Sequence, residues 1–538
     1  MNTQHPYHPI IYVRGFAATQ GEIEETVADP YMGFNIGSTK SRMAWTGDVK
    51  RFYFESPLVR LMSDHKYEDV FVGGEDLVAA ERTDRPIPYK SVIIYRYYDE
   101  ASKDFGKGET PPIERFAKGL GELILRLRDK LCKDNPVNAV TSADFRVHLV
   151  AHSMGGLVCR AFLQNPKLGS EEARAAVDKF FTYATPHNGI DMRIVRNVPG
   201  WLSFGDVNNF NREKMAGYLG LPKGDDVSIV KNFPPERIFN LVGTNPRDYT
   251  VGSGISSWAA GDASDGLVRI DNATTHGPGP DGKDVSSPRA FVHRSHSGHY
   301  GIVNSEEGYQ NLTRFLFGAL RVDGILDIDE ITLPEEVQTA LDDGKEVRAS
   351  YQIEIAVSVR GCQWQMTRRE VRENSAMFRT YDDLFPKKGR KRTPDRSQSP
   401  HLFSVFLDPS KSVEASGSVS FAFDLKVLVP DYEVAKLLLL KSHYEGGYIL
   451  RELILVEAFP DEAALGGWRI KYGYQDDNPG KPGLDAVTRR LGGVGGGDAK
   501  ADAAAKAPPR GIAFDIPIAQ KTKPGLKGTL RIEARPWS

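Results

Sequence analysis

Cysteine is scarce in this sequence, and positive and negative charges nearly balance. Cys132, Cys159 and Cys362 are the only three cysteines among 538 residues, and they are far apart. An odd number at such spacing indicates neither a disulfide framework nor a zinc site built from cysteine pairs. The formal net charge of -2 gives no electrostatic basis for binding nucleic acid or a strongly anionic membrane. One basic cluster, residues 387–392, lies among Pro, Ser and Asp, and we interpret it as a solvated loop.

Long apolar runs are missing as well. No stretch approaches the length needed to cross a bilayer. The first residues lack a basic start followed by an apolar segment, so no signal peptide is predicted. We therefore expect a soluble protein that is cytoplasmic or exported without a conventional signal peptide.

The first half of the chain alternates strand-like and helical segments. A hydrophobic content of 40% is ordinary for a globular protein, and the length predicts two or three domains. The alternation predicts an α/β domain over residues 1–325, with a mostly parallel sheet covered by helices on both faces. An insertion over about 18–90 interrupts it. The expected strands are 10–13, 91–98, 146–151, 179–184, 237–242 and 289–293, and the expected helices include 113–132 and 309–320.

After about residue 335 the pattern changes to strict alternation of apolar and polar residues. It is clearest at 353–359 and 419–427, and it recurs in parts of 450–456 and 529–532. Such alternation predicts an antiparallel β-sandwich domain over 335–538. The apolar segment 434–440 fits either a short helix or a buried strand. Residues 476–510 include a Gly- and Ala-rich stretch and are expected to form a flexible loop.

The segment around Ser153 carries the strongest chemical signal. An apolar run rich in β-branched residues ends at Ala151-His152-Ser153, and a helical segment follows Gly155. Small residues two positions to either side of a serine are needed on a sharp strand-to-helix turn, where there is no room for branched side chains. A serine that only caps a helix is the common alternative. The flanking strand and helix favour a nucleophile.

A nucleophilic serine needs an acid and a base, and the later segments offer candidates for both. Asp265 follows the strand predicted at 237–242 and precedes a glycine that leaves its carboxylate unobstructed. Asp262 and Asp271 compete with it. We expect Asp265 to be the acid.

The base is expected after the last strand, where His293, His296 and His299 lie three residues apart. His299 lies in a turn of small residues directly before the final helix, so we prefer it. His296 is the alternative base. Three histidines at this spacing also fit a metal site, but on a strand and turn they do not share one face, so we expect no metal.

The oxyanion of an acyl-transfer intermediate needs backbone donors. Gly15 allows the chain to bend after the first strand, which would direct the amide of Phe16 towards the serine. The amide of Met154 is free at the start of its helix. We expect Phe16 and Met154 to form the oxyanion hole.

Four segments together resemble bacterial lipases and esterases of the α/β-hydrolase superfamily. Ala-His-Ser-Met-Gly at 151–155 is similar to their nucleophile turn, and Thr-Pro-His-Asn-Gly at 185–189 resembles a segment after the next strand. Residues 264–268 resemble the acid segment and residues 299–304 the histidine segment. The order Ser, Asp, His is the order of this fold. The resemblance covers roughly residues 9–320 and implies an α/β-hydrolase domain.

One residue departs from the family. Arg14-Gly15 stands where these enzymes usually have His-Gly. The oxyanion donor is a backbone amide, so the change need not abolish activity, but it leaves open how that loop is supported. Residues 190–260 contain many apolar side chains and are expected to form a cap that either opens at a lipid surface or is an ordinary packed helical cap.

The resemblance implies a serine hydrolase that cleaves carboxylic esters through Ser153, Asp265 and His299, with no cofactor. The expected partner is an ester or lipid substrate, with transient contact of the cap with a lipid surface and no nucleic acid. A phospholipase or a polyester-degrading enzyme is an alternative within the same chemistry. The alternative from a different class is a non-catalytic binding protein with a hydrolase fold. No ligand spacing indicates structural calcium.

Overall fold

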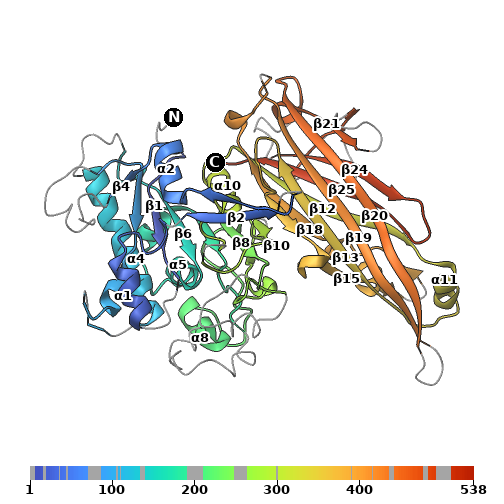
Figure 1. Cartoon of the computed structure of the whole chain (residues 1–538), viewed down its shortest axis with the longest axis horizontal. Coiled ribbons are helices and arrows are strands. Elements are labelled where there is room, and N and C mark those ends of the chain that lie inside the picture. The colour runs from blue at the N-terminus through green and yellow to red at the C-terminus, as the bar shows by residue number, and fades with distance from the viewer. Residues whose placement is uncertain are drawn as a thin grey trace. The chain divides into compact units, whose positions relative to one another are not determined.

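A computed structural model gives the arrangement of most of the chain. It describes residues 6–15, 20–35, 37–43, 46–70, 87–104, 107–108, 111–133, 140–190, 210–247, 263–280, 282–298, 301–388, 391–414, 416–435, 441–475, 483–491 and 511–538. The chain forms two compact units, Met1–Phe317 and Gly318–Ser538 (Figure 1). The division lies before residue 325, where the sequence pattern placed it, because a strand begins directly after the last helix of the first unit.

The first unit contains a seven-stranded sheet in which all strands are parallel. Its order is β11-β8-β7-β6-β1-β5-β4. The bounds are β1 Ile10–Val13, β4 Glu68–Asp69, β5 Ser91–Ile94, β6 Val147–His152, β7 Val177–Tyr183, β8 Ile238–Gly243 and β11 Arg289–Val292. The central strands are buried apolar runs, as expected for a parallel sheet covered on both faces.

Helices cover both faces of this sheet. Alternate residues of β7 point to opposite faces. Phe180 belongs to the same hydrophobic core as α4 (Ile113–Arg128) and α5 (Met154–Gln164). Phe181 instead packs near Phe315 of α10 (Glu306–Phe317), with ring centroids 6.0 Å apart. The α10 helix therefore lies on the face opposite α4 and α5.

The insertion predicted at 18–90 contains regular elements of its own. They are α1 Gln20–Ala28, β2 Ser38–Met43, β3 Val49–Phe54, α2 Pro57–His65 and the edge strand β4. The α2 helix packs on α10: the Arg60 guanidinium pairs with Glu306 and lies 3.7 Å from the centre of the Tyr309 ring. The hydroxyl of Tyr309 also donates to Asp64 at 2.8 Å. This part of the insertion thus supports the last helix of the unit.

The segment expected to form a cap is described only in part. Residues 191–209 and 248–262, which include Trp201 and Trp258, lie outside the described ranges. The α8 helix, Arg212–Leu219, buries Met215 and Leu219 in the main core. β8 follows it as a strand of the parallel sheet. The described part of this segment is therefore packed into the body of the unit.

The second unit contains two larger antiparallel sheets. One has the order β18-β12-β25-β24-β23, and the other runs β14-β13-β19-β20-β21-β22, with β15 also paired to β13. The strand bounds are β12 Leu320–Thr332, β13 Val347–Val359, β14 Thr367–Arg369, β15 Met377–Thr380, β18 His401–Leu407, β19 Val419–Ala435, β20 Lys441–Pro460, β21 Trp468–Tyr474, β22 Leu484–Asp485, β23 Arg489–Arg490, β24 Ile512–Gln520 and β25 Gly525–Pro536. Two short helices, α11 (Glu335–Asp342) and α12 (Tyr381–Leu384), belong to the same unit, and the small hairpin of β16 (Lys387–Lys388) and β17 (Lys391–Arg392) occupies the basic cluster.

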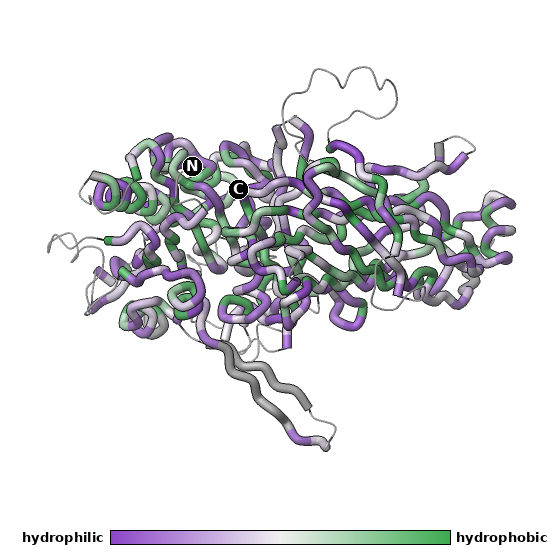
Figure 2. The backbone as a smooth tube through the Cα atoms, turned by 90° about the horizontal axis from the view of Figure 1, so that it is seen from above, coloured by the Kyte–Doolittle hydropathy of each residue, from purple (hydrophilic) through white to green (hydrophobic). Residues whose placement is uncertain are grey.

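One hydrophobic core joins the two large sheets of this unit. Phe403 of β18 lies 5.8 Å from Phe423 of β19, measured between ring centroids. Hydrophobic and hydrophilic residues alternate along the strands, as the colouring of Figure 2 shows. This alternation gives each sheet one apolar face, which packs into the shared core.

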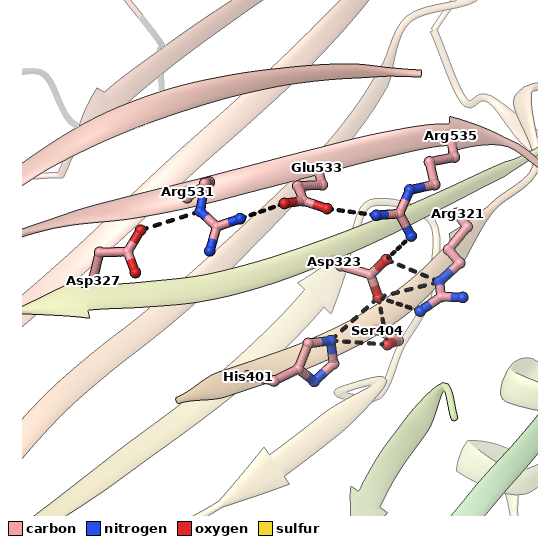
Figure 3. Close-up of polar contacts among 8 residues, drawn as sticks. All are labelled: Arg321, Asp323, Asp327, His401, Ser404, Arg531, Glu533 and Arg535. Carbon is pink, nitrogen blue, oxygen red and sulfur yellow. Dashed lines mark hydrogen bonds and ion pairs between the residues drawn. The ribbon is translucent and has the colours of Figure 1, made fainter. Parts of the chain in front are cut away.

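A polar network lies on the opposite face of the five-stranded sheet (Figure 3). Asp323 is at its centre and pairs with Arg321 at 2.9 Å, while the hydroxyl of Ser404 donates to it at 2.6 Å. Burial opposes ionisation of Asp323, but Arg321, His401 and Arg535 hold the pKa of this carboxyl well below its ordinary value. The network continues along β25 through Glu533 and Arg531 to Asp327.

Two further observations bear on the sequence-based expectations. The predicted flexible loop at 476–510 contains the short strands β22 and β23, while 476–482 and 492–510 lie outside the described residues.

Within the described part of the chain, none of the helices combines the length and the apolarity that a membrane span requires.

Candidate active site

Ser153 lies at the junction of β6 and α5, where the backbone turns sharply. Its φ of 52° and ψ of -124° are rare for a residue with a side chain. Such conformations cost about 1–3 kcal/mol and persist where the surrounding structure imposes them. The amide of Ser153 donates to the carbonyl of Tyr183 at 2.9 Å, and the residue is 4% exposed. A buried serine is thus held in a strained turn at the carboxyl end of the central strand.

Three glycines make room for this turn. A Cβ on Gly15 would lie 2.7 Å from the Cβ of Ser153. One on Gly155 would overlap the carbonyl oxygens of Val13 and Arg14, and one on Gly156 would overlap the Thr185 side chain. Glycine is therefore needed at these three positions because the segments that follow β1, β6 and β7 approach one another closely.

The hydroxyl of Ser153 faces an imidazole, which contacts a carboxylate through its other ring nitrogen. His296 Nε2 lies 2.9 Å from Ser153 Oγ, and its Nδ1 lies 2.9 Å from Asp265 Oδ2. All three side chains are buried. The geometry fits a neutral imidazole in which Nδ1–H donates to Asp265 and Nε2 accepts from the serine. His296, the alternative base, is thus in contact with Ser153, whereas His299 lies outside the described residues.

Backbone amides hold the carboxylate of Asp265. Its second oxygen, Oδ1, accepts from the amides of Leu267 at 3.0 Å and Val268 at 2.7 Å. The residue lies in a tight turn in which Gly266 has a φ of 99°. The amide of His296 donates to the carbonyl of Asp265 at 2.9 Å. Asp265 therefore orients the imidazole through both its side chain and its backbone.

His152 supports the imidazole from the other side. Its Nε2 lies 2.9 Å from the carbonyl oxygen of His296, and the two ring centroids are 4.9 Å apart. Burial holds the pKa of His152 well below its ordinary value, and the charge of Arg14 acts in the same direction. His152 is therefore neutral and can donate one N–H to this carbonyl.

An ion pair anchors the loop that carries His296. Arg294 donates to Glu307 of α10 at 2.9 Å, and both side chains are almost fully buried. Gly243, at the end of β8, lies beneath this loop: a Cβ there would be 2.7 Å from both the Asp265 Cβ and the Arg294 carbonyl oxygen. This close approach brings the acid turn and the histidine loop together.

A buried arginine holds the Thr-Pro-His-Asn-Gly segment at residues 185–189. Arg160 of α5 donates to the carbonyl of His187 at 3.0 Å and to those of Val227 and Ile229. Burial lowers the pKa of Arg160 to about 10. His187 is fully buried, and its Nε2 lies 3.3 Å from Thr182 Oγ1. The ring of His187 therefore contacts β7, and none of its described hydrogen bonds involves Ser153, Asp265 or His296.

The expected oxyanion donors are described in part. Met154 is the first residue of α5 and is buried directly beside Ser153. The first amides of a helix have no partners within the helix, and its dipole adds positive potential there. Phe16 lies outside the described residues.

The other candidate acids and histidines are arranged differently. Asp271 is exposed in the short turn Ile270–Asn272, and Asp262 lies outside the described residues. His293 Nδ1 lies 3.3 Å from Thr244 Oγ1. Among the residues that can be described, no group of His, Cys, Asp or Glu could hold a metal ion.

Arg14 supports the loop after β1 through its side chain and its carbonyl group. Its guanidinium donates to the carbonyl of Met32, and its own carbonyl accepts from the hydroxyl of Tyr97 at 2.6 Å. The side chain thus connects the end of β1 to the turn that follows α1. Sequence patterns contain no signal for this contact, nor for the Arg294–Glu307 pair, because both partners lie on separate segments.

Comparisons with known proteins return only distant similarities. No protein-family model and no curated protein matches the sequence. Among solved structures, the chain is similar to the mature form of Bacillus licheniformis lipase BlEst2, with 13% identity, a TM-score of 0.28, and coverage of 58% of this chain and 91% of that one. The propeptide form of the same lipase gives 10% identity, a TM-score of 0.28, and coverage of 82% of this chain and 96% of that one. A Lactobacillus plantarum WCFS1 protein described as a putative cell surface hydrolase gives 13% identity, a TM-score of 0.22, and coverage of 57% of this chain and 90% of that one. At such TM-scores the chemistry must be argued from the geometry of the site.

Proposed function

We propose that this protein is a serine hydrolase that cleaves carboxylic esters. The observation that carries the proposal is the relay from Ser153 through His296 to Asp265, with two contacts of 2.9 Å. The strained turn that presents the serine supports the same conclusion. A buried serine that only capped a helix would need neither the imidazole nor the carboxylate behind it.

In the proposed reaction, Ser153 attacks the ester carbonyl while His296 Nε2 removes the hydroxyl proton. Asp265 stabilises the imidazolium that forms and keeps Nδ1 protonated. The amides of Met154 and Phe16 bind the oxyanion of the tetrahedral intermediate. His296 then protonates the leaving alcohol, and a water molecule cleaves the acyl-enzyme by the same steps, with His296 again as the base.

The finer assignment is a lipase or an esterase of the α/β-hydrolase type. In this proposal residues 190–260 form the cap over the acyl group, and the antiparallel sheets after Gly318 form a β-sandwich accessory domain. A phospholipase or a polyester-degrading enzyme would use the same three residues. The substrate is therefore distinguished by its acyl chain and alcohol, and a lipase is expected to contact a lipid surface through the cap.

Hydrolysis of p-nitrophenyl esters from acetate to palmitate tests the proposal. We expect turnover that disappears in Ser153→Ala, with the melting temperature changed little because the hydroxyl is small. The matched control is Ser170→Ala, which removes the N-cap hydroxyl of α6 (Glu171–Ala175) and should keep the turnover of the wild type. A maximum at long chains would indicate a lipase, and one at acetate or butyrate an esterase.

The choice of base has its own test. We expect His296→Ala to lower kcat about as much as Ser153→Ala, because both belong to one unit. His299→Ala is the matched control and should retain most of the activity. Loss of activity in His299→Ala but not in His296→Ala would identify His299 as the base.

A non-catalytic binding protein is the competing hypothesis from another class. Labelling with a fluorophosphonate separates the two, because only an activated serine reacts readily. Labelling of the wild type but not of Ser153→Ala would support the enzyme. Absence of both labelling and turnover would favour the binding protein.

A further inference from the structure

His152 lies between the nucleophile and the base. It is the last residue of β6 and the neighbour of Ser153 in the chain. Its Nε2 lies 2.9 Å from the carbonyl oxygen of His296. A carbonyl oxygen only accepts, so Nε2 carries the proton of the neutral ring. The side chain of His152 therefore donates a hydrogen bond to the backbone of the base.

The ring of His152 has close neighbours on two sides. Its centroid lies 4.9 Å from that of His296, with an angle of 46° between the ring planes. Its Nδ1 lies so close to Gly15 that a Cβ on this glycine would be 3.0 Å from it. These neighbours limit the rotation of the ring, so its N–H stays directed at the carbonyl of His296.

Two segments hold His296 by both its backbone and its side chain. On the acid side, its amide donates to the carbonyl of Asp265 and its Nδ1 lies beside the carboxylate, each at 2.9 Å. On the nucleophile side, its carbonyl accepts from His152 and its Nε2 contacts Ser153, again at 2.9 Å each. The serine gives up its hydroxyl proton during attack, and its oxygen is esterified in the acyl-enzyme. The bond from His152 takes no part in the reaction and persists when the contact with the serine is lost.

We propose that His152 is a positioning residue that keeps His296 at the correct distance from Ser153 throughout the reaction. This inference rests on the proposed ester hydrolysis. The acid turn and the histidine loop follow β8 and β11, whereas the nucleophile follows β6. The bond from His152 connects the backbone of the base to the strand that bears the nucleophile. It therefore controls the distance of proton transfer, on which the rate depends steeply.

Two substitutions at position 152 separate the hydrogen bond from the packing of the ring. Phenylalanine keeps a ring without a donor, whereas glutamine removes the ring but can place an amide N–H near the position of Nε2. In His152→Phe we expect kcat for p-nitrophenyl butyrate to fall about ten- to a hundredfold and KM to stay within about twofold, because the base is displaced while substrate binding is unchanged. His152→Gln should keep kcat within about fivefold of the wild type. The rate of labelling by a fluorophosphonate should follow kcat in both variants, whereas a role in packing alone predicts the opposite order.

His148→Phe is the matched control. His148 lies on the same strand, and its Nε2 lies 2.9 Å from the carbonyl oxygen of Pro6. The substitution removes the same kind of bond near the amino end of β6, away from the serine. It should lower the melting temperature and leave kcat as in the wild type.

Each outcome separates this inference from the proposed function. Wild-type kcat in His152→Phe, or equal losses in both variants at position 152, would overturn the positioning role and leave ester hydrolysis intact. An equal loss in His148→Phe would show a general effect of destabilisation and would overturn the role as well. Absence of Ser153-dependent turnover and labelling in the wild type would refute the proposed function and the inference with it.

A measurement on the wild type keeps the proposal testable if His152→Phe does not fold. Nuclear magnetic resonance of protein with isotopically labelled histidine reports which ring nitrogen carries a proton, and the signals of His152 are those missing from His152→Gln. We expect a neutral ring protonated at Nε2 at about pH 7, because burial holds the pKa of His152 well below its ordinary value. Absence of the Nε2 proton would overturn the proposal, since the ring could then not donate to the carbonyl of His296.

Discussion

Replacing Asp265 by asparagine tests the relay most directly, because the surroundings decide how the new amide must lie. Oδ1 accepts two backbone amides, from Leu267 and Val268, and Oδ2 accepts from His296. Asparagine has one oxygen. If its NH2 faced the two backbone amides, two buried donors would lose their acceptor, at about 1–3 kcal/mol each. The oxygen therefore stays with the backbone, and the NH2 faces the imidazole.

This orientation reverses the role of His296. The NH2 group donates to Nδ1, so the proton of the neutral ring moves to Nε2, and Nε2 can no longer accept from Ser153. We expect kcat to fall about ten-thousandfold, as for a triad with the wrong tautomer, which corresponds to about 5 kcal/mol. The assay is p-nitrophenyl butyrate hydrolysis at about pH 8, above the ordinary pKa of histidine, with a thermal melt to show that the fold is retained.

Asp271→Asn is the matched control, since Asp271 is an exposed acid in the same segment. It should leave kcat unchanged. Activity of Asp265→Asn within about tenfold of the wild type would refute the reasoning, because the base would then work without its carboxylate.

Three further predictions concern stability, measured by thermal unfolding against pH. Burial lowers the pKa of His276, but its bonds to Asp284 and Asp226 raise it overall, so the stability lost in His276→Gln should be largest below about pH 6.5 and vanish as pH rises through the raised pKa. Asp323→Asn should lower the free energy of unfolding by about 3–5 kcal/mol at pH 7. The loss should be smaller below about pH 4, where Asp323 becomes protonated in the unfolded chain and the stability that its ionised form contributes declines. Burial lowers the pKa of Lys179 to about 7, so the wild type should gain stability relative to Lys179→Met between about pH 7 and 10. A difference independent of pH would contradict each of these.

The parallel sheet was predictable because its strands are buried apolar runs. Segments such as 146–151 and 237–242 read as strands, and β6 and β8 lie within a residue of these bounds. β12 was not predicted. Its apolar residues alternate with acids such as Asp323 and Asp327, and it begins only three residues after α10 ends. The change from helical spacing to strand alternation within three residues leaves the sequence with little local indication of where the strand begins.

Sequence patterns single out Ser153 and Asp265 as candidate site residues, but they do not choose among the histidines. Ser153 and Asp265 stand in local patterns that require a turn, and both are brought together with His296. Spacing along a loop does not tell which of several histidines returns to the serine. That choice depends on long-range contacts, such as the pairing of Arg294 with Glu307.

The helix α10 limits how this protein can be divided for separate expression. Its first turn carries Glu307, the anchor of the loop that bears His296, and its last turn is bonded by the Lys179 ammonium at the Leu316 carbonyl. A new chain end at residue 317 would place a free carboxylate beside that lysine and allow the helix to fray. A truncation that keeps several residues beyond Phe317 is therefore the safer choice for preparing the first unit alone.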